Sequence, residues 1–390
     1  MEGRRVDVAR GDFYPAYVVW ELTLACDHAC AHCGSRAGRA RERELSLDEA
    51  LDVVAQLADA GTRECVLIGG EAYLYEGYLT VLRALADAGI RPLMTSGGRG
   101  LSAARCAEMK AHGLFAVSVS VDGLEASHDR IRARRGSHAA ALRAIDNAVA
   151  AGLRVSCNTN VNALNEADLE ALYELLRDAG VTAWQVQLTA PLGRAADHVE
   201  MLLQPAQLLD VVPRVVELKR RGFDDGVLLM PGNNLGYFGP GEATLRSQDL
   251  EASDHWQGCQ AGRYVMGIES DGAIKGCPSL QTASYVGGNI SERPLAEIWR
   301  DSEALAFARA RSVADLWGFC RECPFAETCL GGCTFTAHAL LGRPGNNPYC
   351  HFRATEMHRR GLVERLVLVE AAPGRPFDNG RFEIVVDTLA

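Results

Sequence analysis

Six apolar, strand-like runs alternate with helical runs between about residues 15 and 225, and this alternation limits the folds open to the chain. The runs are rich in β-branched residues, as expected of parallel strands that are covered on both faces. They span residues 17–24, 65–68, 91–95, 115–121, 154–161 and 183–188. Because successive β–α units join by right-handed crossovers, we expect an α/β fold, a partial (β/α)6 TIM-like barrel. A doubly wound open sheet fits the same alternation.

Residues typical of helix ends mark the helical runs. Ser46 with Glu49 predicts a capping box, and Asn165 with Asp168 predicts an N-cap followed by an acidic first turn. A glycine follows each helical run, and glycine takes the left-handed conformation at a helix C-terminus without steric cost. These glycines are Gly61, Gly89, Gly113, Gly152, Gly180 and Gly222.

The sequence pattern changes after residue 225. Residues 231–234 (Pro-Gly-Asn-Asn) and 236–241 are rich in turn-forming residues and predict a linker. From Cys259 to Cys350 the chain has short elements, many glycines and seven cysteines, which predict a small domain without a large apolar core. A last strand is expected at residues 382–386. The expected segments are an N-terminal segment (1–15), a barrel (16–225), a linker (226–255), a cysteine-rich domain (256–355) and a C-terminal helix and tail (356–390).

Composition excludes several classes of protein. The first seven residues contain no apolar run, so no signal peptide is expected, and no stretch approaches the roughly 20 apolar residues of a membrane helix. The net charge is −10 and the basic residues are scattered, which argues against a nucleic-acid partner. We therefore expect a cytoplasmic protein, and in a reducing compartment 13 cysteines predict metal binding or catalysis rather than disulfides.

Cys26, Cys30 and Cys33 come directly after the first predicted strand. Three thiolates on a short loop are able to bind three irons of a [4Fe–4S] cluster and to leave the fourth iron open for chemistry. A zinc site that uses His28 or His32, or simply buried cysteines, fits this spacing as well.

Together with the end of the second strand, this spacing resembles the signature of the radical S-adenosylmethionine (SAM) superfamily. Gly69-Gly70-Glu71 is similar to the family's Gly-Gly-Glu motif, which grips the amino group of SAM. Glycines permit close approach of the backbone, and a carboxylate pairs with an ammonium group. Ala72 stands where the family usually has proline.

Residues 118–123 (Ser-Val-Ser-Val-Asp-Gly) resemble the family's fourth-strand motif. The resemblance implies that Ser120 and Arg135 contact the carboxylate and ribose of SAM. It also places Asn158 and Asn160 near the ribose and Gln187 near the adenine. A purely structural role fits each of these residues too, because polar side chains on loops often satisfy backbone groups.

Seven later cysteines resemble the SPASM domain, which follows many radical SAM barrels and carries two auxiliary [4Fe–4S] clusters. The resemblance implies interlaced ligation, with cluster I held by Cys259, Cys277 and Cys333, and cluster II by Cys320, Cys323, Cys329 and Cys350. No cysteine lies between the first two, so the fourth ligand of cluster I stays open. Zinc bound by four of the seven thiolates is the alternative.

Three further cysteines, Cys65, Cys106 and Cys157, lie in strand-like or helical runs. We expect them to be small buried hydrophobic residues rather than ligands.

The resemblance implies three [4Fe–4S] clusters, reductive cleavage of SAM to a 5′-deoxyadenosyl radical, and abstraction of hydrogen from a substrate carbon. It also implies an external electron donor of the flavodoxin or ferredoxin type. The leading hypothesis is a maturase that cross-links or otherwise oxidises a ribosomally made peptide. A small-molecule, sugar-type dehydrogenase or epimerase is second. A non-catalytic zinc or electron-transfer protein is third.

The sequence identifies no general base, because Pro278 and Ser279 follow Cys277 where sulfatase-maturing members carry an aspartate. Only 25 residues precede the first cysteine loop, which is too few for a domain that recognises the leader of a precursor peptide. We therefore expect a separate leader-binding protein. Asn233, Asn234 and Tyr237 in the predicted linker are the residues expected to contact a peptide backbone.

Overall fold

The structure is a computed structural model that describes residues 12–248 and 254–389. All six predicted strands are present, and they pair in parallel in the order of the sequence. They are β1 (Tyr17–Thr23), β2 (Glu64–Gly69), β3 (Arg91–Ser96), β4 (Ala116–Ser120), β5 (Arg154–Val161) and β6 (Ala183–Leu188). The strands are largely buried, as the apolar runs predicted.

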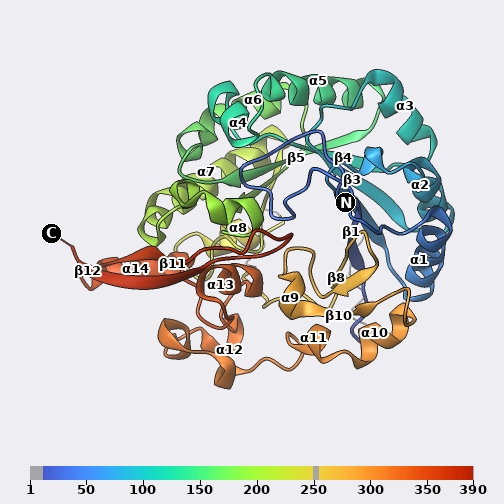
Figure 1. The fold of residues 1–390 in the computed structure, drawn as a ribbon. Helices are drawn as coiled ribbons and strands as arrows, with labels where there is room; N and C mark the ends of the chain where they lie inside the picture. The colour runs from blue at the N-terminus through green and yellow to red at the C-terminus, as the bar shows by residue number, and fades with distance from the viewer. Residues whose placement is uncertain (1–11, 249–253, 390) are drawn as a thin grey trace.

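The strand order decides between a barrel and a doubly wound sheet. From β1 to β6 the order never reverses, whereas a doubly wound sheet reverses its order at a switch point. Figure 1 accordingly shows the helices as an outer ring on one side of the curled sheet. The predicted partial TIM-like barrel is confirmed. The helices of this ring are α1 (Leu47–Asp59), α2 (Tyr78–Asp87), α3 (Ala103–Ala111), α4 (Glu125–Ile131), α5 (Ser137–Ala150), α6 (Leu169–Asp178) and α7 (Leu208–Asp225).

The sheet continues past the predicted strands at both edges. β7 (Leu228–Pro231) adds in parallel to β6, and β8 (Val265–Ile268) adds in parallel to β1. β9 (Ala273–Lys275) and β10 (Val286–Asn289) complete that edge in antiparallel pairing. The first part of the C-terminal cysteine-rich domain, residues 265–289, therefore shares a sheet with the barrel.

The capping box of Ser46 and Glu49 is confirmed, and Asn165 takes the predicted N-cap position, before a 3-10 turn that contains Glu166 and Asp168. The prediction that Gly222 ends a helix is wrong. Asn165 makes no capping bond, because its side chain bonds the backbone of Asp122 and Asn162 instead. Gly222 lies inside α7, and Gly226, with φ of 76°, ends that helix. The other five glycines take the expected left-handed conformation.

The expected linker is also different in the structure. Residues 228–231 form β7, and α8 (Glu242–Arg246) follows. Asn234 is buried, and its amide group makes two hydrogen bonds with the backbone of Leu188, at 3.1 and 2.7 Å. Tyr237 is also buried, against Trp256 and Cys333. Asn234 and Tyr237 therefore brace the barrel edge, and the expectation that they contact a peptide stays a prediction. Asn233 is exposed.

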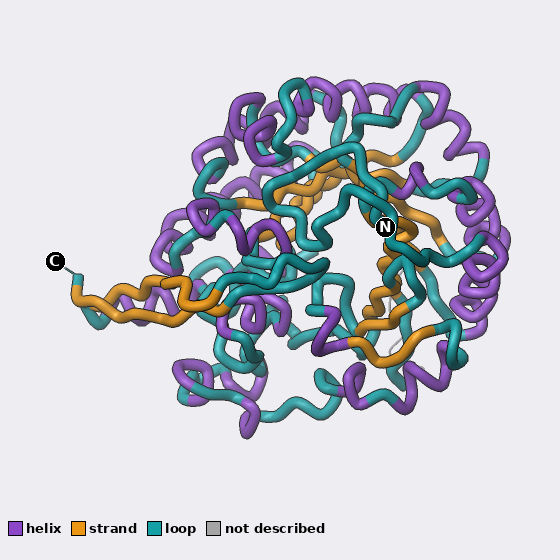
Figure 2. Tube along the Cα trace, in the orientation of Figure 1, coloured by secondary structure: helices purple, strands orange, loops and turns teal. Residues whose placement is uncertain are grey.

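The C-terminal part holds short helices and one hairpin. β11 (Leu362–Glu370) and β12 (Arg381–Thr388) form the hairpin, which projects from the body, and β12 contains the predicted last strand (Figure 1). Figure 2 shows the loop that joins them returning toward the middle of the molecule.

None of the described helices is long and apolar enough to span a bilayer. The short helices of the C-terminal part are α9 (Thr282–Tyr285), α10 (Leu295–Asp301), α11 (Glu303–Ala306), α12 (Ala326–Cys329), α13 (Thr334–Leu341) and α14 (His351–Arg359).

Candidate active site and cysteine clusters

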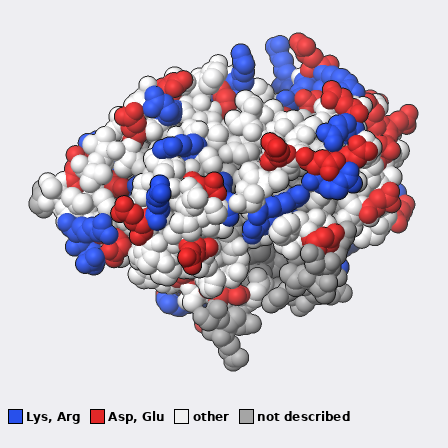
Figure 3. Space-filling view, turned by 90° about the horizontal axis from the view of Figure 1, so that it is seen from below, with Lys and Arg blue, Asp and Glu red and all other residues white. Residues whose placement is uncertain are grey.

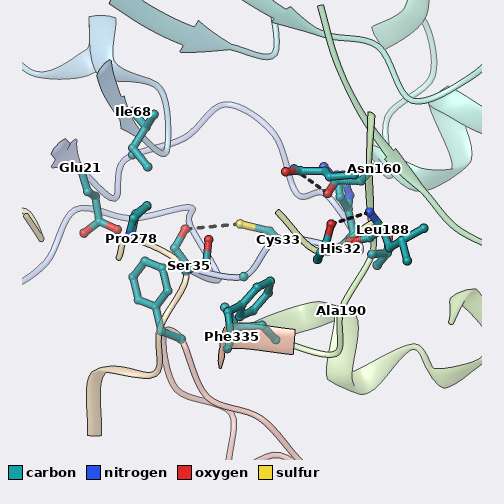
Figure 4. Close-up of a pocket in the computed structure, with 18 residues that line it drawn as sticks. Glu21, His32, Cys33, Ser35, Ile68, Asn160, Leu188, Ala190, Pro278 and Phe335 are labelled. Carbon is teal, nitrogen blue, oxygen red and sulfur yellow. Dashed lines mark hydrogen bonds between the residues drawn. The ribbon is translucent and has the colours of Figure 1, made fainter. Parts of the chain in front are cut away.

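A cavity of about 930 Å³, partly open to solvent, lies at the barrel mouth. Its walls come from the first cysteine loop, the ends of β2, β5 and β6, and the cysteine-rich region. In Figure 4, Glu21 and Pro278 lie toward one end of the cavity and Asn160 and Leu188 toward the other, with Cys33 between them. Parallel barrels place their catalytic groups at this end of the strands.

Three cysteine thiols gather on the loop after β1. Cys30 is buried, Cys33 lines the cavity, and the sulfur of Cys26 lies within 4.8 Å of a carboxylate oxygen of Glu71. Burial, with smaller contributions from Glu71 and the nearby thiols of Cys30 and Cys33, raises the pKa of the Cys26 thiol to about 12. Thiols this reluctant to ionise bind a metal only if its charge compensates them, and a set of three sulfurs suits an iron–sulfur cluster.

The two glycines at the end of β2 allow this loop to pack closely. The amide of Gly70 donates to the carbonyl of Thr23 at 2.7 Å, and that of Glu71 donates to Ala25 at 2.8 Å. A Cβ atom on Gly69 would lie 2.1 Å from the oxygen of Thr23, so no larger residue fits there. Gly69 lines the cavity.

The carboxylate of Glu71 is buried and bound within the protein. It accepts hydrogen bonds from the hydroxyl of Ser96 and the amide of Gly97, both at 2.7 Å. Burial raises its pKa to about 7. Glu71 and Gly70 do not line the cavity, so the structure shows Glu71 joining β2 to the end of β3 rather than facing open space.

Arg135, the predicted SAM contact after β4, is exposed and does not line the cavity. Arg132 contacts the cysteine loop, with one guanidinium nitrogen 3.6 Å from the sulfur of Cys30. Another lies 2.7 Å from the carboxylate of Asp122, which is fully buried. The predicted contact of Arg135 with SAM stays a prediction, and the structure adds Arg132 as a buried arginine beside the cysteine loop. Ser120, at the end of β4, is buried and does not line the cavity.

Asp122 joins several parts of the site and was missed as a site residue. Its carboxylate lies 3.3 Å from a ring nitrogen of His32 and accepts the amide of Asn160 at 2.9 Å. Burial opposes its ionisation, but Arg132 and His32 hold its pKa far below the usual range. Its place in the Ser-Val-Asp-Gly motif was the available sequence signal.

Asn160 and Gln187 both line the cavity, and the amide nitrogen of Gln187 donates to Asn160 at 2.9 Å. They lie together because β5 and β6 pair in register. Asn158 does not line the cavity, and its carbonyl accepts the amide of Val121.

The later cysteines fall into the two groups that the resemblance implied. Four of them line one small cavity together with the rings of four phenylalanines: Cys320, Cys323, Cys329 and Cys350, with Phe238, Phe319, Phe325 and Phe352.

The other group is Cys259, Cys277 and Cys333. Burial raises the pKa of Cys277 to about 12, and the thiols of Cys333 and Cys259 are close enough to contribute to this rise. Phe335 packs against the apolar cluster that contains Cys333 and also against the one that Cys259 and Cys277 adjoin.

The three remaining cysteines, Cys65, Cys106 and Cys157, have no exposed surface and belong to the main hydrophobic core. The prediction that they are small buried hydrophobic residues is confirmed.

Comparison with known proteins agrees with this arrangement. Residues 20–179 match the family model of the radical SAM superfamily, and residues 259–324 match that of the SPASM iron–sulfur cluster-binding domain. This chain belongs to the radical SAM superfamily. It is a radical SAM enzyme with a SPASM domain, and membership implies SAM and a [4Fe–4S] cluster as cofactors.

Two relatives cover most of the chain. An AdoMet-dependent heme synthase of Nitratidesulfovibrio vulgaris is 27% identical over 87% of this chain and 93% of its own. The mycofactocin maturase MftC of Mycolicibacterium smegmatis is 28% identical over 87% of this chain and 84% of its own.

Solved structures share the fold at lower identity. SuiB of Streptococcus suis bound to SAM has a TM-score of 0.66 at 15% identity, covering 86% of this chain and 76% of its own. The structure of anSMEcpe with AdoMet and a peptide has a TM-score of 0.69 at 14% identity, covering 87% and 94%.

Proposed function

We propose that this radical SAM enzyme abstracts hydrogen from a peptide and so matures it oxidatively. The cluster, when bound, supplies the electron that cleaves SAM to methionine and a 5′-deoxyadenosyl radical. The protein holds SAM and substrate in one cavity and excludes water from it.

Cys26, Cys30 and Cys33 would hold the cluster that binds SAM. The place of Cys33 in the cavity wall and the guanidinium of Arg132 beside Cys30 support this assignment. Gly69, Asn160 and Gln187 line the cavity, which supports a role for them in binding SAM.

The two groups of later cysteines would hold auxiliary clusters, with Cys259, Cys277 and Cys333 on cluster I. The separate cavity lined by Cys320, Cys323, Cys329 and Cys350 supports cluster II. An external electron donor of the flavodoxin or ferredoxin type and a separate leader-binding protein are part of the same proposal.

The charge of the cavity is the observation that favours a peptide over a porphyrin as the substrate. Among the described residues that line it, no lysine or arginine is present, and Glu21 is the charged side chain. A porphyrin with several carboxylates needs cations to pair with them, since burial of unpaired charge is costly. The face seen in Figure 3 likewise shows acidic and basic side chains interspersed rather than a basic surface.

Modification of a porphyrin side chain is the second candidate. The similarity to AdoMet-dependent heme synthases and to an Fe-coproporphyrin III synthase, over 87% of this chain, favours it.

The experiment is a substrate comparison with reconstituted enzyme, SAM and reductant. Precursor peptides encoded beside the gene, iron-coproporphyrin III and small sugars are incubated in parallel, and 5′-deoxyadenosine and product masses are measured. Loss of two hydrogens from a peptide, coupled to 5′-deoxyadenosine formation, is expected. Turnover of the porphyrin or a sugar with every peptide inert would overturn the proposal.

A further inference from the structure

One carboxylate oxygen in the cavity wall lacks a partner. Glu21, on β1, is only 2% exposed. Its Oε1 accepts hydrogen bonds from Arg41 at 2.9 Å and from the amide of Ser270 at 3.2 Å. Its Oε2 is shielded from solvent and has no hydrogen-bond partner among the described residues. A buried polar atom of this kind calls for an explanation, and a bound ligand is one.

The walls around Glu21 are apolar and partly aromatic. Ile68, Pro278, Phe335 and Phe377 line the same cavity, and Figure 4 shows Ile68 and Pro278 at the end where Glu21 lies. Pro278 follows directly on Cys277 in the sequence. This end of the cavity therefore lies on the side of the cysteine-rich region.

The loop between β11 and β12 brings Phe377 to this place. The amide of Phe377 donates to the carbonyl of Gly34 at 3.0 Å, and the amide of Gly193 donates to Asp378 at 2.7 Å. Arg36 bonds the carboxylate of Asp378 at 2.9 Å. These contacts fix the aromatic wall in position.

The charges behind Glu21 already balance. Arg41 bonds Glu21 and also Glu269, at 2.8 Å, and Lys275 pairs with Glu269 at 2.7 Å. The two cations compensate the two carboxylates that they bond, so these ion pairs offer no unpaired charge to a ligand. Burial of a further charge there is unfavourable, so a neutral donor suits Oε2 best.

We propose that Glu21, Phe335 and Phe377 form a subsite for a neutral aromatic side chain with a hydrogen-bond donor at its tip, a phenol or an indole. The ring packs on the apolar walls and the O–H or N–H donates to Oε2 of Glu21. The inference rests on the proposed peptide function and names the kind of residue that enters the cavity.

The test measures binding of small probes to reconstituted, SAM-bound enzyme without reductant, by NMR titration. The probes are N-acetyl-tyrosinamide, N-acetyl-phenylalaninamide and N-acetyl-lysinamide. A hydrogen bond to a charged group should make the tyrosine probe bind about tenfold or more tightly than the phenylalanine probe. Equal binding of these two, or tighter binding of the lysine probe, would overturn the subsite.

Three variants test whether the tighter binding of the tyrosine probe depends on Glu21. Glu21→Leu should remove the preference for tyrosine, and Glu21→Gln, which keeps an acceptor oxygen, should retain part of it. Glu269→Gln is the matched control, because it disturbs the same ion pairs without lining the cavity, and its preference should equal that of wild type. A preference that survives in Glu21→Leu refutes the inference. The wild-type probe comparison remains decisive if that variant does not fold.

The same preparation separates this inference from the proposed function. Substrate turnover with formation of 5′-deoxyadenosine, after addition of reductant and a peptide, reports on the function, and probe binding reports on the subsite. A peptide that is oxidised while the tyrosine preference is missing overturns the subsite alone. A preference for tyrosine with every peptide inert supports the subsite and overturns the peptide function.

Discussion

Replacement of Gly70 by alanine should displace the cysteine loop that faces the cavity. A Cβ atom at this position would lie 2.0 Å from the carbonyl oxygen of Ala25 and 2.8 Å from the Cβ of Cys26. The obstacle is backbone, so rotation of a side chain does not relieve it. Gly70 does not have a positive φ, so crowding is the reason that alanine is unfavourable there.

The displacement is large on the scale of a catalytic site. Ordinary contacts of a Cβ atom begin at 3.4 Å, so the backbone next to Cys26 must move by more than about 1 Å. Overpacking of this kind costs about 1–3 kcal/mol of unfolding free energy. A shift of about 1 Å in a catalytic group lowers a rate roughly 100-fold.

The assay compares wild type with Gly70→Ala and Gly38→Ala after anaerobic reconstitution. Gly38 lies on the same loop, has open space around the position of a Cβ and is exposed, so alanine there should be neutral. Bound iron, 5′-deoxyadenosine formation and urea unfolding are measured for each protein. Gly70→Ala should lose about 4 of about 12 irons and nearly all SAM cleavage.

Wild-type iron content and SAM cleavage in Gly70→Ala would refute the reasoning. They would mean that the loop tolerates the displacement and that its close packing against β2 does not position the cluster. Equal losses in Gly38→Ala would also refute it, because they would show that any added methyl group on the loop is harmful.

Three further outcomes are expected. Cys30→Ala should abolish SAM cleavage and leave about 8 of about 12 irons, by iron analysis; wild-type 5′-deoxyadenosine formation would contradict the role of the loop. Arg132→Leu should lower the free energy of unfolding by about 3–5 kcal/mol, because the buried Asp122 loses its partner, whereas the exposed Arg135→Leu should stay within about 0.5 kcal/mol in urea titrations. Burial lowers the pKa of Lys219 from 10.5 to about 8, so the unfolded chain binds its proton more tightly between these values. The stability of wild type relative to Lys219→Met should therefore rise by about 1–3 kcal/mol from pH 8 to 10.5, and a flat or falling difference would contradict the shift.

Local patterns determined most of the fold. The strands β1 to β6 were predictable because parallel strands buried on both faces need continuous apolar runs, and these runs stand out between helices that end in glycine. The cysteine loop was predictable because its three ligands lie close together in the sequence, so their spacing alone limits the metals they suit.

Long-range packing decided what the sequence left open. The burial of Arg132 depends on where α4 ends: its guanidinium lies against Asp122, whereas Arg135, three residues further on, is exposed. Asn234 and Tyr237 were read as turn residues because turn chemistry is local. Their burial depends on the pairing of β7 with β6 and on the cysteine-rich region packed over them.

The sequence by itself therefore determined the class of enzyme and the groups of cysteines proposed to hold its clusters, because both depend on short spacings and on periodic burial. Only the tertiary structure brought Glu21, Pro278 and Phe377 to one cavity wall, although more than 300 residues separate the first from the last. Such contacts follow from strand β1 lying beside β8 and from the hairpin loop returning to the barrel mouth. No local pattern encodes them, because their energy comes from surfaces that meet only once the whole chain has folded.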